Sequence, residues 1–387
     1  MPGQRRVRVL QLIDVLGPGG AEMLLHTLAS SLDAGRFALH VCGLRPDEPY
    51  DLAPQIRALG VPVIGFNQRN AYDIPTLIAL VRYIRRHRID IIHTHLLASD
   101  IMGRVAGFLT RTPVVSTVHN SREDFEHEPA RRRWMERSTA KLWCRRLIVV
   151  SPALREEIAA WFGLPVGRFV AIPNGVDTSR FRPMPDLDKA ALKRDLLGDP
   201  AARGDTPLVL NVARLVPQKG LAYLALAARL VLDARPDARF AVVGQGPLRD
   251  DLLKQVEELG LDGKFVLAGV RSDVPELMAA GDVFVLSSLW EGLPISLLEA
   301  MSSGCPVVAT EVGGVGGVVQ SDRTGLLVPA EDPEALAQAI LRCLNNPQAA
   351  QQRAAAAREW AHRHYSMETW VRKLEQLYLH EVGRRSR

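Results

Sequence analysis

The sequence predicts an α/β protein with two domains, each built around a parallel sheet that helices cover on both faces. A chain of 387 residues exceeds what one hydrophobic core usually sustains. Short runs rich in Val and Ile alternate with amphipathic segments, and these runs are continuously apolar, as in strands buried between two layers of helices. The alternation stops once and then restarts, which indicates two sheets.

The connector between the two series of strands sets the expected domain boundary. The first series consists of RVLQLI, ALHVCGL, IDIIHTH, PVVSTVH and RLIVVS, and the second of PLVLNVARL, ARFAVVG, KFVLAG, DVFVLSS, CPVVAT and GLLVP. A stretch dense in Pro, Gly and Asp separates them and begins near residue 183. We therefore expect domains at 1–182 and 183–365, followed by an amphipathic helix at 366–387.

The composition is that of a folded, soluble protein. Apolar residues make up 47% of the chain and charged residues 24%, which excludes a largely disordered protein. No stretch reaches the roughly 18 apolar residues that span a bilayer, and the N-terminus has no signal-peptide pattern, so we expect a cytoplasmic protein. The four cysteines lack CxxC spacing, which disfavours disulfides and a zinc site.

The charge is unevenly distributed. Residues 1–182 contain 25 Lys and Arg against 17 Asp and Glu, whereas the rest of the chain contains 23 against 26. The basic first half is compatible with peripheral contact to anionic lipids at the inner face of the cell membrane. Its arginines are spread through helical stretches, so solvated helix faces are the simplest interpretation, and we expect no nucleic-acid partner.

Two glutamates in EGLPISLLEAMSSG form the first candidate site. We expect a helix to begin near Pro294, between Glu291 and Glu299. Eight helical residues advance about 12 Å and turn about 80° beyond two turns, so the carboxylates would hold two ends of a long ligand. A nucleotide-diphosphate sugar fits, because it has a diol-bearing ring at each end and phosphates that a helix N-terminus binds. The alternative is a capping Glu291 and a solvent-facing Glu299.

Two cations follow the first strand of the second series, in NVARLVPQKG. Arg214 and Lys219 lie in the loop before the next helix, where phosphates bind in open parallel sheets. A guanidinium and an ammonium there would neutralise a diphosphate leaving group, as a divalent metal does in other enzymes. Solvated loop cations are the alternative.

Glycines join the first strand to the first helix in DVLGPGGAEMLL. Gly17, Gly19 and Gly20 permit close backbone approach to an anion. The run lacks the complete GxGxxG pattern, so it does not support a dinucleotide oxidoreductase. A simple tight turn is the alternative.

Histidines stand at the ends of two strands in the first half. His119 ends PVVSTVHN, and His93 and His95 lie in IIHTHLL. The carboxyl ends of parallel strands form the ligand-binding edge of a sheet. The sequence offers no set of three or four ligands around the HxH pair, so we expect no metal.

Together, these segments resemble the retaining glycosyltransferase family 4, and the resemblance covers nearly the whole chain. The segments that carry it are GPGGAE, STVHN, IPNGVDTSRFRP, NVARLVPQKG, VVGQGPLRDDL, EGLPISLLEAMSSGCPVVAT and TGLLVP. The resemblance implies the GT-B fold, in which two Rossmann-like parallel-sheet domains face each other across a cleft and the last helix packs back on the first domain. It also implies transfer of a hexose-type sugar from a nucleotide-diphosphate sugar, with UDP the expected nucleotide, to a hydroxyl of a carbohydrate or lipid-linked acceptor.

The family motifs imply roles for individual residues of the second half. By this match, Glu299 would bind the donor ribose and Glu291 would contact the transferred sugar. Arg214 and Lys219 would hold the diphosphate. Further donor contacts would come from Val270 and Arg271 at the base, and from Gly292, Leu293 and Pro294 in the EGLP segment.

In the first half, the match places the loop of Gly19 and Gly20 near the distal phosphate and His119 beside the transferred sugar. The implied mechanism is front-face substitution, in which the acceptor hydroxyl attacks on the side from which the diphosphate leaves. No enzyme nucleophile, metal or other cofactor is expected.

The chain departs from the family in one loop. Family members usually have VGG, a small residue, Pro and Glu, whereas this chain has EVGGVGGVV, with Gly316 and Gly317 there. The missing glutamate leaves the identity of the sugar open. Two alternatives remain, a nucleotide-sugar 2-epimerase of the same fold and a non-catalytic nucleotide-sugar-binding protein. A transferase would act in cell-surface glycan, exopolysaccharide or glycolipid synthesis.

Overall fold

The computed structural model describes residues 5–17, 19–45, 52–66, 68, 73–119 and 121–384. The chain forms two compact units. Unit 1 consists of Met1–Gly175 together with Met367–Arg387, and unit 2 consists of Val176–Ser366. Unit 1 therefore receives a helix from a part of the chain that follows unit 2.

Unit 1 is built on a parallel sheet with the strand order β3-β2-β1-β4-β5-β6-β7. The strand order reverses between β1 and β4, which pair from Val9 opposite Ile91 to Ile13 opposite His95. In sheets of this type, ligands bind at the carboxyl ends of the strands where the order reverses. The strands are β1 (Val7–Ile13), β2 (Phe37–Gly43), β3 (Val63–Gly65), β4 (Ile91–His95), β5 (Val114–Val118), β6 (Arg146–Val149) and β7 (Phe169–Ala171).

Alternate residues of β1 and β4 point to opposite faces of this sheet. Leu10 and Ile92 pack with α3 and α4 on one face, whereas Gln11 and His93 bond to Tyr378 of α15 on the other. The helices of unit 1 are α1 (Gly20–Ser31), α2 (Ala53–Ala58), α3 (Ile74–His87), α4 (Leu97–Thr110), α5 (Arg122–Glu126), α6 (Ala130–Trp143), α7 (Arg155–Phe162) and α15 (Met367–Gly383), with 3₁₀ turns η1 (Pro152–Leu154) and η2 (Val166–Arg168).

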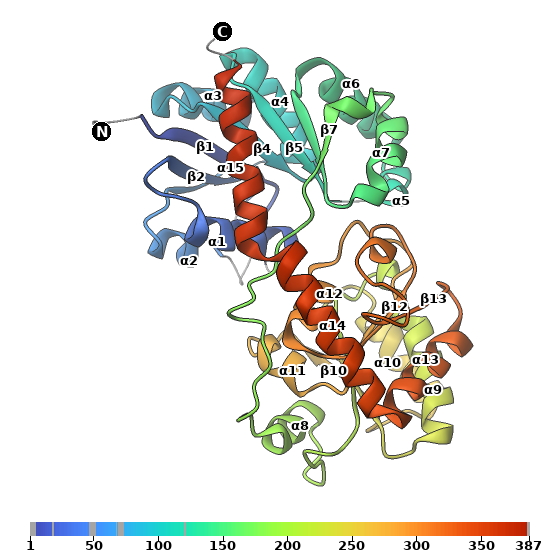
Figure 1. Cartoon of the computed structure of the whole chain (residues 1–387). Helices are drawn as coiled ribbons and strands as arrows, with labels where there is room; N and C mark the ends of the chain where they lie inside the picture. The colour runs from blue at the N-terminus through green and yellow to red at the C-terminus, as the bar shows by residue number, and fades with distance from the viewer. Residues whose placement is uncertain are drawn as a thin grey trace. The chain divides into compact units, whose positions relative to one another are not determined.

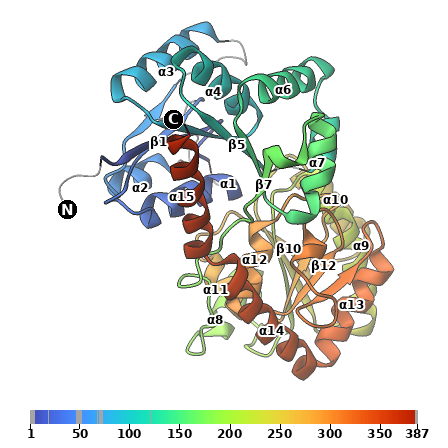
Figure 2. The same cartoon turned by 45° about the horizontal axis from the view of Figure 1, so that its top comes forward.

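Helix α15 is an integral part of unit 1. It packs against α1 and β4 (Figures 1 and 2). Its carboxylate at Glu381 is buried and accepts from Arg146 Nε at 3.1 Å, while Arg145 donates to the Glu381 carbonyl. Its apolar stripe explains the amphipathic pattern of the segment, since one face is buried. The buried apolar side chains of that face are Met367, Trp370, Val371, Leu374, Leu377 and Tyr378.

Unit 2 is also built on a parallel sheet, with the strand order β10-β9-β8-β11-β12-β13. The order reverses between β8 and β11. The strands are β8 (Leu208–Val212), β9 (Arg239–Val243), β10 (Phe265–Gly269), β11 (Val283–Leu286), β12 (Val307–Thr310) and β13 (Leu326–Val328). The helices are α8 (Lys189–Leu197), α9 (Leu221–Ala234), α10 (Arg249–Glu258), α11 (Val274–Ala280), α12 (Ile295–Ser303), α13 (Pro333–Asn345) and α14 (Pro347–Tyr365), with η3 (Pro217–Lys219) and η4 (Val315–Gly317).

Polar caps start several helices of unit 2. The side chains of Asp188, Asp332 and Asn346 each accept a bond from the backbone amide three residues later, at the start of α8, α13 and α14. All four cysteines of the chain are buried as free thiols. Among the helices that the structure describes, none has both the length and the apolar character to cross a bilayer. The strand orders of the two sheets confirm the two predicted parallel-sheet domains.

Candidate functional site

In unit 2, the loops that follow β8 and β11 are tied together at the carboxyl edge of the sheet. Leu289 N donates to the Gln218 carbonyl at 2.8 Å, and Ser287 Oγ donates to the Lys219 carbonyl at 2.9 Å. Gly220 has φ of 57°, and a Cβ at this position would lie 2.1 Å from the Ser287 carbonyl oxygen. Only glycine allows this approach, which brings Lys219 to the β11 loop.

Glu291 lies buried in this pair of loops. Its Oε1 atom accepts from Lys219 Nζ at 2.5 Å and from Ser288 Oγ at 2.6 Å, and its side chain is only 5% exposed. A buried carboxylate requires such a charge partner and such hydrogen bonds. Helix α12 starts at Ile295 after Pro294, and no side chain caps it. The structure therefore excludes Glu291 as the cap of α12 and brings it together with Lys219.

Glu299 lies on α12 and is half-buried. Burial raises the pKa of this carboxyl to about 7, and the positive charge of Arg180 opposes the rise. A ligand that donates hydrogen bonds to Glu299 favours its ionised form. Leu293, just before the helix, is 4% exposed and anchors the loop in the core.

The loop EVGGVGGVV, in which the chain departs from the family pattern, packs on the backbone of residues 291–292. Gly314 N donates to the Gly292 carbonyl at 2.9 Å. Gly313 has φ of 50°, and a Cβ there would come within 1.8 Å of the Glu291 carbonyl oxygen. The following turn, η4, carries the two glycines of the departure, and both are exposed. Its first half thus fixes residues 291–292, while in its second half a Cβ on Gly316 would lie 3.3 Å from Glu311 Oε1.

Three further residues of unit 2 that the sequence predicts as donor contacts are not bonded to the Lys219–Glu291 pair in the described part of the chain. They are Arg214, Val270 and Arg271. Arg214 is exposed, and within the described part of the chain it forms no ion pair. Val270 is 42% exposed. Arg271 bridges Asp273 at 2.6 Å and Asp195 at 2.7 Å, and these carboxylates raise its pKa. The Arg271 guanidinium is thus bound to two carboxylates, whereas Arg214 is available to an anion.

In unit 1, the glycine loop leads into the N-terminus of α1. Gly19 is the N-cap residue and Gly20 is the exposed first residue of the helix, and no side chain caps it. A Cβ on Gly19 would come within 2.1 Å of Glu22 Oε2. A carboxylate therefore lies beside the positive end of α1, where helices also bind phosphates.

His119 follows β5 and is half-buried at the same edge. Its Nε2 atom lies 2.9 Å from His95 Nδ1, and His95 Nε2 lies 2.7 Å from Gln11 Oε1. Gln11 is completely buried on β1. The ends of β1, β4 and β5 thus join in one hydrogen-bonded row.

The row continues through α15. Gln11 Nε2 donates to the Tyr378 hydroxyl at 2.9 Å, and this hydroxyl lies 2.7 Å from His93 Nδ1. His93 Nε2 lies 2.7 Å from Thr117 Oγ1. We call these six side chains the histidine network: His119, His95, Gln11, Tyr378, His93 and Thr117.

The three imidazoles of the histidine network are neutral. Burial lowers the pKa of His93 to about 3 and that of His119 to about 4, and it also holds the pKa of His95 well below its usual range. Within the described ranges, no group of three or more His, Cys, Asp or Glu side chains is arranged to bind a metal. The HxH pair is instead part of the hydrogen-bonded row.

Asp14 and a strained residue hold the end of β4 in place. Asp14, directly after β1, accepts from Ser99 N at 2.7 Å and from Ser99 Oγ at 2.8 Å in the first turn of α4. Leu96 adopts φ of 71° and ψ of 162°, a backbone conformation that residues other than glycine rarely adopt. The fixed turn after His95 limits where its ring can lie.

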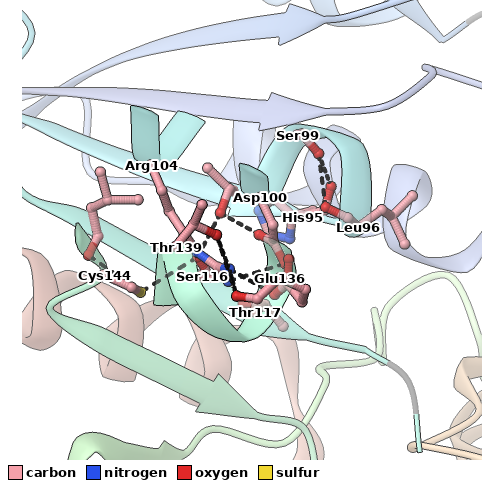
Figure 3. A network of polar contacts seen from close by, with 12 residues as sticks. His95, Leu96, Ser99, Asp100, Arg104, Ser116, Thr117, Glu136, Thr139 and Cys144 are labelled. Carbon is pink, nitrogen blue, oxygen red and sulfur yellow. Dashed lines mark hydrogen bonds and ion pairs between the residues drawn. The ribbon is translucent and has the colours of Figure 1, made fainter. Parts of the chain in front are cut away.

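A buried charged cluster lies behind these strand ends and joins α4 to α6 (Figure 3). The guanidinium of Arg104 donates to Glu136 Oε1 at 2.7 Å and to Ser116 Oγ at 3.0 Å, and it lies 3.3 Å from the Asp100 carboxylate. Burial raises the pKa of Glu136 to about 8 and also raises that of Asp100, while Arg104 opposes both shifts. These charged side chains are almost wholly buried, so loss of one of them would leave its partner's charge buried and unpaired.

Sequence reasoning missed Ser288, Gln11 and Tyr378. Ser288 stands three residues before Glu291 in the same loop, a spacing that could have suggested it. Tyr378 is 285 positions from its partner His93, and no local pattern reveals such a bond. The amphipathic pattern of α15 predicts burial of Tyr378 but not its partner.

Comparison with known proteins gives the same family for both units. A family model described as Glycosyltransferase Family 4 matches residues 18–180. A second, described as Glycosyl transferases group 1, matches residues 193–360. The two matches together cover most of the chain.

Individual relatives are also similar over most of their length. The UDP-Gal:alpha-D-GlcNAc-diphosphoundecaprenol alpha-1,3-galactosyltransferase of Escherichia coli is 32% identical, over 79% of this chain and 83% of the relative. The 2-deoxystreptamine N-acetyl-D-glucosaminyltransferase of Streptomyces fradiae is 31% identical, over 99% and 92%. The solved structure of Anabaena HepE in complex with UDP-glucose shares the fold with a TM-score of 0.84 at 24% identity, over 96% and 99%.

Proposed function

This chain belongs to glycosyltransferase family 4, and we propose that it transfers a hexose-type sugar from a UDP-sugar to a hydroxyl group, with retention of configuration and without a metal ion. The observation that carries the proposal is the buried cluster of Lys219, Glu291 and Ser288 at the carboxyl edge of the unit 2 sheet. It places a cation and a carboxylate beside the uncapped N-terminus of α12. This combination suits a diphosphate joined to a sugar.

Each part of the donor has a proposed partner. Glu299 binds the ribose diol, and the α12 N-terminus with Arg214 and Lys219 binds the diphosphate. The segment of Gly292, Leu293 and Pro294 lines the donor, and Val270 with Arg271 lies near the base. From unit 1, Gly19, Gly20 and His119 are further proposed donor contacts.

The Lys219–Glu291 pair suggests how the site accepts the donor. Without ligand, the ammonium neutralises a carboxylate that is almost fully buried. When the donor binds, Lys219 turns to the diphosphate and Glu291 accepts hydrogen bonds from hydroxyls of the sugar. As the bond between sugar and phosphate breaks, negative charge grows on the leaving diphosphate, and Arg214 with Lys219 stabilises it. The departing phosphate receives the proton of the attacking hydroxyl.

The donor test starts from a panel of nucleotide-diphosphate sugars. A true donor raises the melting temperature of the protein, because it binds the folded state. We expect UDP-sugars to give the largest shift and chelator to leave turnover unchanged. UDP release that requires a hydroxyl acceptor supports a transferase, whereas sugar epimerisation without acceptor would indicate a 2-epimerase. NMR of the product's anomeric proton tests retention, and an inverted product would contradict it.

We propose a lipid-linked acceptor, as in the diphosphoundecaprenol named for the E. coli relative, rather than 2-deoxystreptamine, as named for the Streptomyces relative. The support is an exposed face of α6. Trp134 and Leu142 are 68% and 65% exposed there, and exposed Arg131 and Lys141 lie within about 100° of them around the helix. At the adjoining end of α4, Phe108 is 58% exposed. Apolar side chains among cations suit the surface of an anionic membrane.

Vesicle sedimentation tests this contact. We expect binding to vesicles that contain phosphatidylglycerol, weaker binding at high salt, and loss of binding when Trp134 and Leu142 are both changed to Ser. The matched control changes two exposed leucines of unit 2, Leu226 and Leu253, to Ser and should bind normally. Equal binding of both double variants would contradict the proposed face.

A further inference from the structure

The bond directions in the histidine network follow from one buried amide. Gln11 donates through Nε2 to the Tyr378 hydroxyl, so this hydroxyl uses its own proton elsewhere. Its second partner is His93 Nδ1 at 2.7 Å, which therefore accepts. His93 is neutral, so it carries its proton on Nε2 and donates to Thr117.

The other side of the amide determines the proton position on His119. Gln11 Oε1 is an acceptor, so His95 carries its proton on Nε2. The remaining nitrogen of neutral His95, Nδ1, must accept, and its partner is His119 Nε2 at 2.9 Å. His119 therefore holds its single proton on Nε2, and its Nδ1 keeps a lone pair.

Neutrality is what couples these bonds. In a neutral imidazole, one nitrogen donates and the other accepts, so fixing one bond fixes the next. Burial keeps all three rings neutral near neutral pH. All five bonds then run in one direction, from His119 to Thr117, and each strengthens its neighbours.

We propose that Tyr378 of α15 is a positioning residue of the transfer reaction, because its hydroxyl, through Gln11 and His95, sets the tautomer in which His119 offers an unprotonated Nδ1 to a hydroxyl of the sugar substrate. This inference rests on the proposed function for the contact of His119 with the sugar. The tautomer itself does not depend on it.

The role of the Tyr378 hydroxyl is seen by removing it. With the hydroxyl present, turning the Gln11 amide reverses the bonds to His93 and Thr117 as well as those to His95 and His119. Without the hydroxyl, turning the amide reverses only the bonds to His95 and His119. His95 then donates through Nδ1, and His119 carries its proton on Nδ1, where it can no longer accept.

A matched control exists in the same unit. The Tyr83 hydroxyl lies 2.6 Å from His40 Nδ1, which is the same kind of bond, but neither residue belongs to the histidine network. Tyr83→Phe therefore removes a tyrosine–histidine bond without touching His119. A general loss of stability would affect both variants, whereas a tautomer effect is specific to Tyr378→Phe.

The experiment compares wild type, Tyr378→Phe and Tyr83→Phe, each labelled with ¹⁵N-histidine, by long-range ¹H–¹⁵N NMR without ligand. We expect the His119 signal to show an Nε2–H tautomer in wild type and Tyr83→Phe, and a gain of the Nδ1–H tautomer in Tyr378→Phe. Gln11→Met breaks the same link while keeping the tyrosine, and it should produce the same change if Tyr378→Phe does not fold. An unchanged His119 tautomer in the folded variants overturns the inference.

Kinetics with the UDP-sugar identified by the donor screen complete the test. We expect kcat to fall about tenfold in Tyr378→Phe, the size of one lost hydrogen bond, with KM for the donor nearly unchanged. Tyr83→Phe should keep the wild-type kcat. A changed tautomer with wild-type kcat would overturn the positioning role and the sugar contact of His119. An unchanged tautomer in a fully active Tyr378→Phe would overturn the relay through Tyr378 and leave the proposed transferase activity intact.

Discussion

The two units have the same type of sheet but different chemistry at their carboxyl edges. The edge of unit 2 holds charges, with the Lys219–Glu291 ion pair between two loops and Arg214 exposed in the loop after β8. The edge of unit 1 holds neutral rings and amides joined by hydrogen bonds, with His119 at one end. Charge suits a site where a diphosphate leaves, and neutral acceptors suit sugar hydroxyls. Two sheets of the same type thus carry different chemistry at their edges, because the side chains that follow their strands differ.

The largest expected effect tests the charged edge. Lys219→Ala should lower kcat by about 10²–10³-fold, because it removes a cation from the leaving diphosphate. The measurement is turnover of the purified variant at saturating donor. Lys254→Ala, which removes an exposed lysine of α10, is the control and should retain activity.

A double variant separates catalysis from folding. Lys219→Ala also leaves Glu291 buried without its charge partner, which destabilises the protein. Glu291→Gln in the same chain removes that unpaired charge, so Lys219→Ala/Glu291→Gln should melt closer to wild type and remain inactive. Recovery of turnover in the double variant would show that Lys219 acts only through the stability of the loop.

A smaller effect concerns the pH dependence at Glu299. Its pKa of about 7 is raised in the free protein, and a bound ribose diol favours the carboxylate. UDP binding should therefore release a proton and weaken as pH falls below that value. Glu299→Gln should bind UDP about tenfold more weakly above the pKa, with little pH dependence. Calorimetry in two buffers of different ionisation enthalpy measures the proton release.

The control for this pH effect is Glu258→Gln, which changes an exposed glutamate on α10 and should show wild-type proton release.

Without ligand, the contribution of Glu299 to folding stability has the opposite pH dependence to its effect on UDP binding. The raised pKa means that the folded protein retains a proton where the unfolded chain has lost it, so this contribution falls as pH rises from about 4.5 to about 7. Equal proton release by wild type and Glu299→Gln would exclude Glu299 as the ribose contact.

The smallest effect concerns acid stability and distinguishes the neutral edge from the charged one. His93 and His119 have folded-state pKa values of about 3 and about 4, below the usual value of about 6.5. Below about pH 6.5 the unfolded chain binds protons that the folded protein excludes, so unit 1 loses stability until the folded-state pKa values are reached. We expect the protection of amides in β4 and β5 against hydrogen exchange, relative to the intrinsic rate at each pH, to fall on acidification before that in β8 and β11.

His93→Gln should reduce this difference, because a residue that cannot titrate takes the place of a buried histidine. The exchange of peptides from both units, followed by mass spectrometry in the same sample, provides the internal control. A parallel loss of protection in the two units at every pH would contradict the proposed contrast.

The sequence predicts the fold well, because parallel strands buried on both faces leave continuous apolar runs. These runs identify both sheets, and the motifs around Glu291 and Lys219 identify the family. The start of unit 2 is less evident. It begins at Val176, before the dense Pro and Gly stretch, because Val176 N bonds to the Tyr365 carbonyl. A backbone bond between such distant residues leaves no mark on either segment.

The features of the candidate site likewise divide into those that the sequence predicts and those that it does not. Loop position alone brings Arg214, Lys219 and Glu291 to the ends of β8 and β11, because strand ends meet at one edge. The sequence does not show that Lys219 and Glu291, 72 positions apart, form an ion pair, since either side chain could face solvent. Nor does the sequence show that His93 bonds to Tyr378 and Thr117. Tertiary partners decide what a polar side chain does.

The contribution of α15 to unit 1 has a consequence for the order of events during synthesis. A ribosome completes all of unit 2 before it makes Tyr378 and Glu381. Until then, Gln11 and His93 lack the hydroxyl that joins them, and Arg146 lacks its buried carboxylate. Unit 1, whose first seven strands are made before unit 2, therefore cannot complete its native packing until unit 2 has been made.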